Sequence, residues 1–316
     1  MNSFLKRILF AVTVILATTI AVQAQQEKKQ QRGKTAVAGA LRAAAEKVDR
    51  DITYGQAGGV DLKLDLYYPK EDSKKPHAIA IYVHGGGWTG GDKAGGAGAL
   101  AIPELLKRGY LVASINYRLA PQYKFPAQIE DCKCAIRFFR ANAEKYNLDP
   151  NRIGVFGSSA GGHLVALLGT ADESAKFDTS GGWTNQSSRV QAVVDMFGPT
   201  DFSARVGRPN KRLDETVFDV GNKGEGALKL ASPVNYVSKG DAPFLILHGD
   251  KDELVPLEQS ERLLAALKKN DVPAKLVVVK NAAHGFAPNG GTPDPSREKL
   301  ATMIADFFDE HLGKKP

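Results

Sequence analysis

Cysteine is scarce in this chain of 316 residues, which contains only Cys132 and Cys134. The two residues stand two positions apart in a segment with helical periodicity, so their side chains point to different faces of the expected helix and do not easily form a bridge. A fold held together by disulfides is therefore excluded, and stability has to come from a packed core. The length suits one large α/β domain or two small ones, and the lack of a clear linker favours one.

Signals for nucleic acids and nucleotides are also missing. Basic residues do not alternate with aromatic residues in any stripe, which argues against a nucleic-acid partner. Gly85, Gly87 and Gly90 satisfy the G-x-G-x-x-G pattern of dinucleotide sites, but further glycines separate them from the next helix signal, and their strand is not the first of the chain. No Gly-Lys-Ser/Thr follows this loop, so a Walker A site is excluded as well.

The amino-terminal segment has the pattern of a secretory signal peptide. Lys6 and Arg7 precede an apolar run, residues 8–22, which is shorter than a membrane-spanning helix and ends in small residues. We expect cleavage after Ala24, a secreted or periplasmic protein, and no stable insertion into a membrane. Removal of residues 1–24 takes away two basic residues and no acid, which lowers the formal net charge from +7 to +5.

Three further segments are set apart by composition. Residues 25–50 are expected to hold a glutamine-rich, solvated tether followed by an alanine-rich helix at residues 35–48. The folded domain is expected to span residues 51–316. Within it, residues 200–242 carry many glycine, aspartate, lysine and arginine residues without clear periodicity. We expect this stretch, named the cap segment below, to form a small insertion above the sheet.

Strand and helix patterns alternate through the expected domain. Apolar or alternating runs predict strands at residues 51–54, 60–68, 78–83, 110–115, 153–156, 190–197, 244–247 and 274–279. Helical periodicity predicts helices at residues 97–108, from 126 onward, and at 257–268 and 296–312. This alternation predicts an α/β fold with a mostly parallel sheet and helices on both faces. The first two strands, joined by a tight turn at Gly58-Gly59, supply an antiparallel edge.

The sharpest local signal is a Gly-x-Ser-x-Gly turn between a buried strand and a helix. Gly157 and Gly161 flank Ser159 at the two positions where a side chain would collide if the backbone folded back tightly. Such a turn exposes a hydroxyl at the tip of a strand, next to the amino terminus of a helix. The sequence therefore predicts Ser159 as a nucleophile.

A serine nucleophile needs a base and an acid, which follow it in the order acid then histidine in this kind of sheet. His284 comes just after the strand at residues 274–279 and is the predicted base. Asp252 follows the preceding strand and is the preferred acid, with Asp250 and Glu253 as alternatives. All of them lie past the carboxyl ends of strands, the edge where open α/β sheets bind ligands.

The loop His84-Gly85-Gly86-Gly87-Trp88 supplies a further part. An acyl-transfer reaction places negative charge on the carbonyl oxygen, so N–H groups have to point there in advance. Consecutive glycines let backbone amides approach the substrate, and Ala160 offers another amide at a helix start. The indole of Trp88 is expected beside the scissile ester, where it binds substrate and limits the depth of the acyl pocket. His84 is expected to anchor the loop.

These motifs together resemble the α/β-hydrolase esterases, and within them the hormone-sensitive-lipase-related and feruloyl or acetyl esterase branches. They are His84-Gly85-Gly86-Gly87-Trp88, Tyr117-Arg118-Leu119-Ala120-Pro121, Gly157-Ser158-Ser159-Ala160-Gly161-Gly162, His248-Gly249-Asp250-Lys251-Asp252 and His284-Gly285-Phe286. The resemblance covers residues from about 51 to 312. It implies a catalytic triad of Ser159, Asp252 and His284. It also implies an oxyanion hole formed by the amides of Gly86, Gly87 and Ala160. Arg118 and Asp131 are implied as a structural ion pair.

The expected activity is that of a secreted serine carboxylesterase that needs neither a metal nor an organic cofactor. Its substrates are expected to be small-molecule or polysaccharide esters with short or aromatic acyl groups, including those of plant cell-wall carbohydrate. Two alternatives remain from the residues alone. One is an exopeptidase of the prolyl-oligopeptidase type, and the other is a catalytically silent α/β-hydrolase that serves as a binding module.

Overall fold

A computed structural model describes residues 43–70, 75–204 and 211–313. Nearly all of these residues belong to one compact unit, Ala44–Pro316. The expected signal peptide, the tether and most of the expected helix at residues 35–48 lie outside the described residues. None of the helices that are described has both the length and the apolar character needed to cross a membrane.

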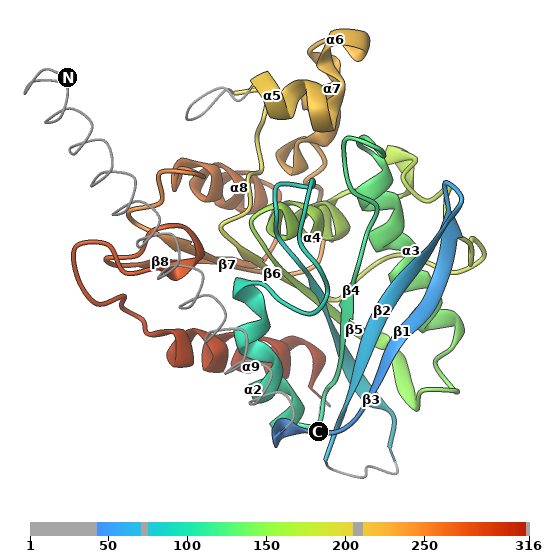
Figure 1. The fold of residues 1–316 in the computed structure, drawn as a ribbon. Helices are drawn as coiled ribbons and strands as arrows, with labels where there is room; N and C mark the ends of the chain where they lie inside the picture. Colours follow the sequence, from blue (N-terminus) through green and yellow to red (C-terminus); the bar gives the residue numbers. More distant parts are fainter. Residues whose placement is uncertain (1–42, 71–74, 205–210, 314–316) are drawn as a thin grey trace, which may run out of the picture. The chain divides into compact units, whose positions relative to one another are not determined.

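The described part of the chain contains an eight-stranded sheet (Figure 1). In spatial order the strands are β1 (Ala45–Ala57), β2 (Val60–Pro69), β4 (Leu111–Ile115), β3 (His77–Val83), β5 (Leu148–Ser158), β6 (Ala192–Met196), β7 (Phe244–Gly249) and β8 (Ala274–Val279). The β1–β2 and β2–β4 pairs are antiparallel, and the other pairs are parallel. The predicted mostly parallel sheet with an antiparallel edge is confirmed.

The first strand starts earlier than the sequence predicts, and the helix expected up to Val48 is wrong for its described part. Residues from Ala45 onward form β1, in which Lys47 pairs with Tyr68 and Val48 with Tyr67. Alanine has a high helix propensity, but propensity is only a weak preference that tertiary contacts override. Pairing with β2 along the whole strand decides the conformation here. The hairpin turn at Gly58-Gly59 is where the sequence predicts it.

Helices cover both faces of the sheet (Figure 1). On one face lie α3 (Ala127–Ala141), α4 (Ala160–Thr170) and α8 (Glu258–Lys269), and on the other lie α2 (Ile102–Lys107) and α9 (Arg297–Leu312). The stretch predicted as one helix at residues 97–108 is a 3-10 turn, Ala97–Ala101, followed by α2. Cys132 and Cys134, both on α3, are buried and unbridged, as predicted.

The described part of the cap segment contains four short helical turns before the 3-10 turn Pro233–Asn235. They are α5 (Lys211–Leu213), a π-helical turn (Asp214–Phe218), α6 (Val220–Lys223) and α7 (Gly226–Ala231). Val217, Phe218 and Leu228 of this segment are buried in the main hydrophobic core. These three apolar side chains of the cap segment thus point into the domain, whereas Leu230 is exposed.

Glycines allow α4 to approach the sheet closely at the turn after β5. A Cβ atom at Gly157 would lie 2.3 Å from the carbonyl oxygen of Gly161, and one at Gly161 would lie 2.1 Å from that of Val83. Real Cβ atoms do not come this close to backbone oxygens. The expected reason for the two glycines around Ser159 is therefore correct, and the start of α4 is pressed against β3.

Substitution of Gly161 tests this close approach. Gly161→Ala is expected to lower the free energy of unfolding by about 3 kcal/mol, because the added methyl group meets backbone, or Tm by roughly 6–12 °C for a chain of this size. The control is Gly95→Ala, since a Cβ at Gly95 meets nothing within 4 Å, and its expected effect is below about 0.5 kcal/mol. Equal thermal stability of the two variants would contradict the packing.

Candidate active site

Ser159 occupies the turn between β5 and α4 in a strained backbone conformation. Its φ of 56° and ψ of −120° are rare for a residue with a side chain. Its N–H donates to the carbonyl of Met196 at 2.9 Å, and its own carbonyl accepts from the N–H of His163 at 3.0 Å. These two bonds hold the strained residue between β6 and α4. The hydroxyl is left at the carboxyl edge of the sheet, on a partly exposed residue.

His284 lies between Ser159 and Asp252. Its Nε2 is 3.0 Å from Ser159 Oγ, and its Nδ1 is 2.7 Å from Asp252 Oδ2. Since a carboxylate only accepts, Nδ1 carries the proton and Nε2 is free to take one from the hydroxyl. The structure thus brings together the three residues that the sequence predicts as nucleophile, base and acid.

Asp252 is held as a carboxylate by its surroundings. Its Oδ1 accepts from the N–H groups of Leu254 and Val255, each at 2.9 Å. Burial by itself opposes ionisation, but hydrogen bonds from His248, His284 and the amide of Val255 outweigh it and hold the pKa of Asp252 well below its usual value. The carboxylate therefore stays ionised at neutral pH.

Neither of the two alternative acids is hydrogen-bonded to His284 among the described residues. Asp250 Oδ1 accepts from the N–H of Ala282 at 3.3 Å, and the N–H of Asp250 donates to Val279 at 3.0 Å. Asp250 thus ties the loop after β7 to the end of β8, as a turn-holding residue does. No contact between Glu253 and His284 is present among the described residues.

His248 has a structural role next to the candidate acid. It is fully buried, with Nδ1 at 2.7 Å from Ser260 Oγ and Nε2 at 2.8 Å from the carbonyl of Val255. The same Nε2 lies 3.5 Å from Asp252 Oδ2. His248 therefore fixes the loop that carries Asp252 through its contacts with Val255 and Asp252.

The glycine loop after β3 has free amides. Gly86 and Gly87 have φ values of 121° and 60°, and the carbonyl of Gly86 closes the loop by accepting from Thr89 and Gly90. The amides of Gly86, Gly87 and Ala160 find no acceptor among the described residues. Such amides, next to a nucleophile, suit an oxygen that gains negative charge.

His84 anchors this loop, as expected. Its Nδ1 lies 2.7 Å from the carbonyl of Gly85, and its ring stacks on Tyr117 at 4.4 Å between centroids. Burial lowers the pKa of His84. The ring is therefore neutral and serves to hold the loop.

Trp88 is placed differently from the prediction of a substrate-binding residue. Its side chain is almost fully buried, at 3% exposure, and packs edge-on against His163, Phe202 and Phe218. Its Nε1 donates to His163 Nδ1 at 3.1 Å. An indole next to a glycine turn was expected to face the ligand, but the positive φ of Trp88, 59°, turns it into the core.

Sequence reasoning missed Phe197. It directly follows β6 with a φ of 46°, and its ring meets the imidazole of His284 edge-on at 4.8 Å. The sequence shows that Phe197 ends a buried strand, but the contact depends on its unusual backbone conformation. Phe197 limits how far the imidazole can tilt.

The implied ion pair of Arg118 and Asp131 is present, with Nη2 and Oδ1 at 2.7 Å and Asp131 fully buried. Nothing in the described ranges groups three or more histidine, cysteine, aspartate or glutamate residues as metal ligands.

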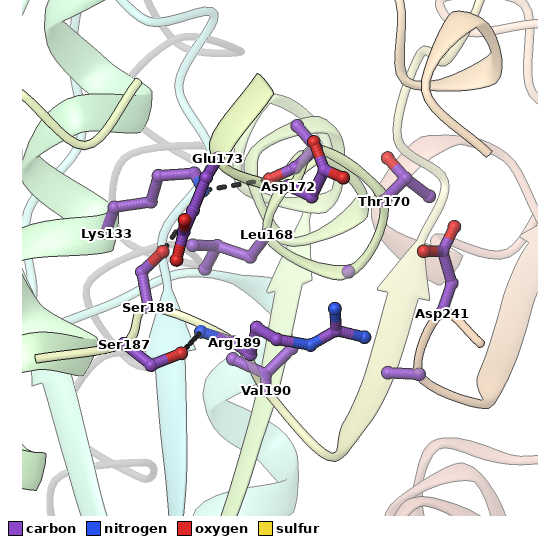
Figure 2. A pocket seen from close by; sticks show the side chains of 13 residues that line it. Lys133, Leu168, Thr170, Asp172, Glu173, Ser187, Ser188, Arg189, Val190 and Asp241 are labelled. Carbon is purple, nitrogen blue, oxygen red and sulfur yellow. Dashed lines mark hydrogen bonds between the residues drawn. The ribbon is translucent and has the colours of Figure 1, made fainter. Parts of the chain in front are cut away.

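A polar pocket elsewhere is separate from this site (Figure 2). It lies at the end of α4, between Thr170 and residues 187–190, whereas Ser159 precedes the start of that helix. The helix puts about 16 Å between them. Lys133 at its wall is already bonded to Ala171, Asp178 and Ser188.

Known proteins resemble this chain in sequence and in fold. The BD-FAE family model matches residues 64–267. Esterase LipC of Mycobacterium tuberculosis is 31% identical over 277 residues, which are 85% of this chain and 67% of LipC. A truncated carbohydrate esterase from gut microbiota has a TM-score of 0.71 and 30% identity, covering 86% of this chain and 98% of its own. Propionate-bound Est2 of the planctomycete Thermogutta terrifontis has a TM-score of 0.70 and 28% identity. This match covers 86% of this chain and 96% of the Est2 chain.

Asparagine substitutions separate the two aspartates. Asp252→Asn is expected to lower kcat for p-nitrophenyl acetate by about 10⁴, because an amide can hold the imidazole in the wrong tautomer. Asp250→Asn, the matched control, should retain kcat and change mainly Tm. Steady-state kinetics and thermal unfolding of both variants give the answer. Interchanged effects would assign the acid to Asp250.

Proposed function

This chain belongs to the BD-FAE family of α/β-hydrolase esterases, and from that premise we propose that it hydrolyses short or aromatic acyl esters through an acyl-enzyme on Ser159. The observation that carries the proposal is the hydrogen-bonded chain from Ser159 Oγ through His284 to Asp252, with distances of 3.0 and 2.7 Å. Two proteins of similar sequence are named as an esterase, LipC, and as a probable carboxylic ester hydrolase, LipM, which supports the proposal.

The acylation step follows from the positions of the protons. Ser159 Oγ attacks the ester carbonyl while His284 Nε2 takes the hydroxyl proton, and the same nitrogen then gives that proton to the departing alcohol. Asp252 accepts the Nδ1–H bond throughout and stabilises the imidazolium without taking its proton. Water, activated by His284, attacks the acyl-enzyme in the second half and restores the hydroxyl.

The free amides supply the charge stabilisation. Both tetrahedral intermediates carry a negative oxygen, and the N–H groups of Gly86, Gly87 and Ala160 are the donors proposed to receive it. They are in place before the reaction, so no reorganisation is needed when the charge develops. Loss of one such donor typically costs about 10²–10³ in kcat.

The distribution of apolar side chains supports a short acyl group. The apolar residues Val217, Phe218 and Leu228 of the cap segment are used for packing in the core. Exposed large hydrophobic side chains in the described ranges are restricted to Val60, Trp183, Leu230 and Leu254. A long acyl chain would need a continuous apolar lining, which these scattered residues do not provide.

Similar structures support the same choice. One is described as a carbohydrate esterase from gut microbiota, and Est2 is described with propionate and with butyrate bound. We therefore propose acylated carbohydrate, such as that of plant cell walls, as the substrate class. We also propose export of the protein, supported by the basic start and short apolar run of the amino-terminal sequence, which have the signal-peptide pattern.

A substrate panel tests the proposal. Across p-nitrophenyl esters from acetate to octanoate, kcat/KM is expected to fall steeply beyond butyrate, and methyl ferulate or acetylated xylan should be hydrolysed. A tunnel for the acyl chain would instead add up to about 0.8 kcal/mol of binding per methylene, so a rising profile would overturn the short-acyl assignment.

The same panel, extended by aminoacyl p-nitroanilides, has two further outcomes that would replace the proposed function itself. Turnover of aminoacyl p-nitroanilides in preference to the esters would favour the exopeptidase. No turnover of any substrate by folded protein would favour the binding module.

A further inference from the structure

Trp88 occupies a conformation that its own chemistry disfavours. It is the third consecutive residue with a positive φ after Gly86 and Gly87, at 59°. Glycine adopts this region freely, but a residue with a side chain does so at a cost of about 1–2 kcal/mol. Interactions of Trp88 with its surroundings must therefore hold the loop in this shape.

The side chain of Trp88 is held mainly by its contacts with His163. The indole Nε1–H of Trp88 donates to His163 Nδ1 at 3.1 Å, and the two rings meet edge-on at 5.2 Å. The carbonyl of Trp88 also accepts from the N–H of Ala120 at 2.9 Å. His163 is fully buried and lies one turn after Ser159 on α4. The indole thus ties the glycine loop to the helix that carries the serine.

The hydrogen bonds of His163 leave one arrangement of its protons. Nε2 lies 2.7 Å from the carbonyl oxygen of Ala231, at the end of α7 in the cap segment. A carbonyl only accepts, so Nε2 carries the hydrogen and Nδ1 offers a lone pair to Trp88. Burial lowers the pKa of His163 to about 4, so the ring is neutral at ordinary pH.

We propose that the Trp88–His163 hydrogen bond positions the oxyanion donors relative to Ser159. The donors Gly86 and Gly87 directly precede Trp88, and the nucleophile stands four residues before His163. The bond therefore links the segment that carries the amides of Gly86 and Gly87 to the helix that follows Ser159. The distance between these amides and the serine hydroxyl decides whether the amides can donate to the negative oxygen. Trp88 and His163 are positioning residues, and this inference rests on the proposed acyl-enzyme mechanism.

Removal of the indole N–H tests the link. Trp88→Phe keeps an aromatic ring but cannot donate, and kcat per titrated active site is expected to fall about 10- to 100-fold, since a misplacement of about 1 Å can cost 10²-fold. KM should change less than about twofold, because ground-state binding does not use the oxyanion donors in this account.

The chain offers a matched control in its other tryptophan. Trp183 also donates its Nε1–H, to the carbonyl of Tyr54 at 2.8 Å, but on the surface and outside the site. Trp183→Phe removes an equivalent bond and should leave kcat unchanged, even if Tm falls. A merely structural role of Trp88 would give both variants the same pattern of lower Tm with unchanged kcat.

Two further variants keep the test decisive. Benzothienylalanine at position 88, introduced by amber suppression, has sulfur in place of the N–H and retains the shape of the ring, so it answers the question if Trp88→Phe does not fold. His163→Phe should lower kcat by a similar factor, and the double variant with Trp88→Phe should be no slower than either alone, because one link is broken in both.

The outcomes separate the link from the mechanism beneath it. Wild-type kcat in the Trp88 variants, with the p-nitrophenol burst intact, would overturn the positioning role alone. Additive effects of Trp88→Phe and His163→Phe would do the same. Retention of wild-type ester turnover by Ser159→Ala would instead overturn the acyl-enzyme, and with it the basis of the inference.

Discussion

The close contact between the start of α4 and the end of β3 is the constraint on which the site depends. Gly161 has no room for even a methyl group, because the carbonyl oxygens of Val83 and His84 would lie 2.1 and 2.6 Å from it. At Gly161, the strand that ends in the glycine loop and the helix that begins after Ser159 therefore touch through their backbones. The proposed nucleophile Ser159 and the proposed donors Gly86 and Gly87 come from segments more than 70 residues apart in the chain. The close backbone contact brings these two segments together.

The remaining groups reach this contact because parallel strands end at one edge. β7 and β8 deliver Asp252 and His284 in loops of a few residues, and each loop is stiffened from behind, by His248 under Asp252 and by Phe197 against His284. Side-chain freedom has thus been removed around the reacting atoms before any substrate arrives. This is what electrostatic preorganisation requires, since donors that are already aimed need not move as charge develops.

Much of the fold and of the site's geometry could be predicted from the sequence, for a physical reason. The turn at Ser159, the acid at Asp252 and the base at His284 depend on local glycine chemistry and on strand order, which are both visible along the chain. Trp88 was misplaced because its direction depends on a positive φ and on a partner, His163, 75 residues away. The segment from Ala45 was expected to be helical because pairing with β2, not local propensity, decides its conformation.

Covalent labelling of the nucleophile tests the central claim most directly. Paraoxon transfers a diethylphosphoryl group to an activated serine, and an esterase of similar structure is described in a phosphorylated state after reaction with it. We expect peptide mass spectrometry to find one such group, on Ser159, with loss of activity in proportion to labelling. A label on Ser158, or full inactivation with Ser159 unmodified, would contradict the account.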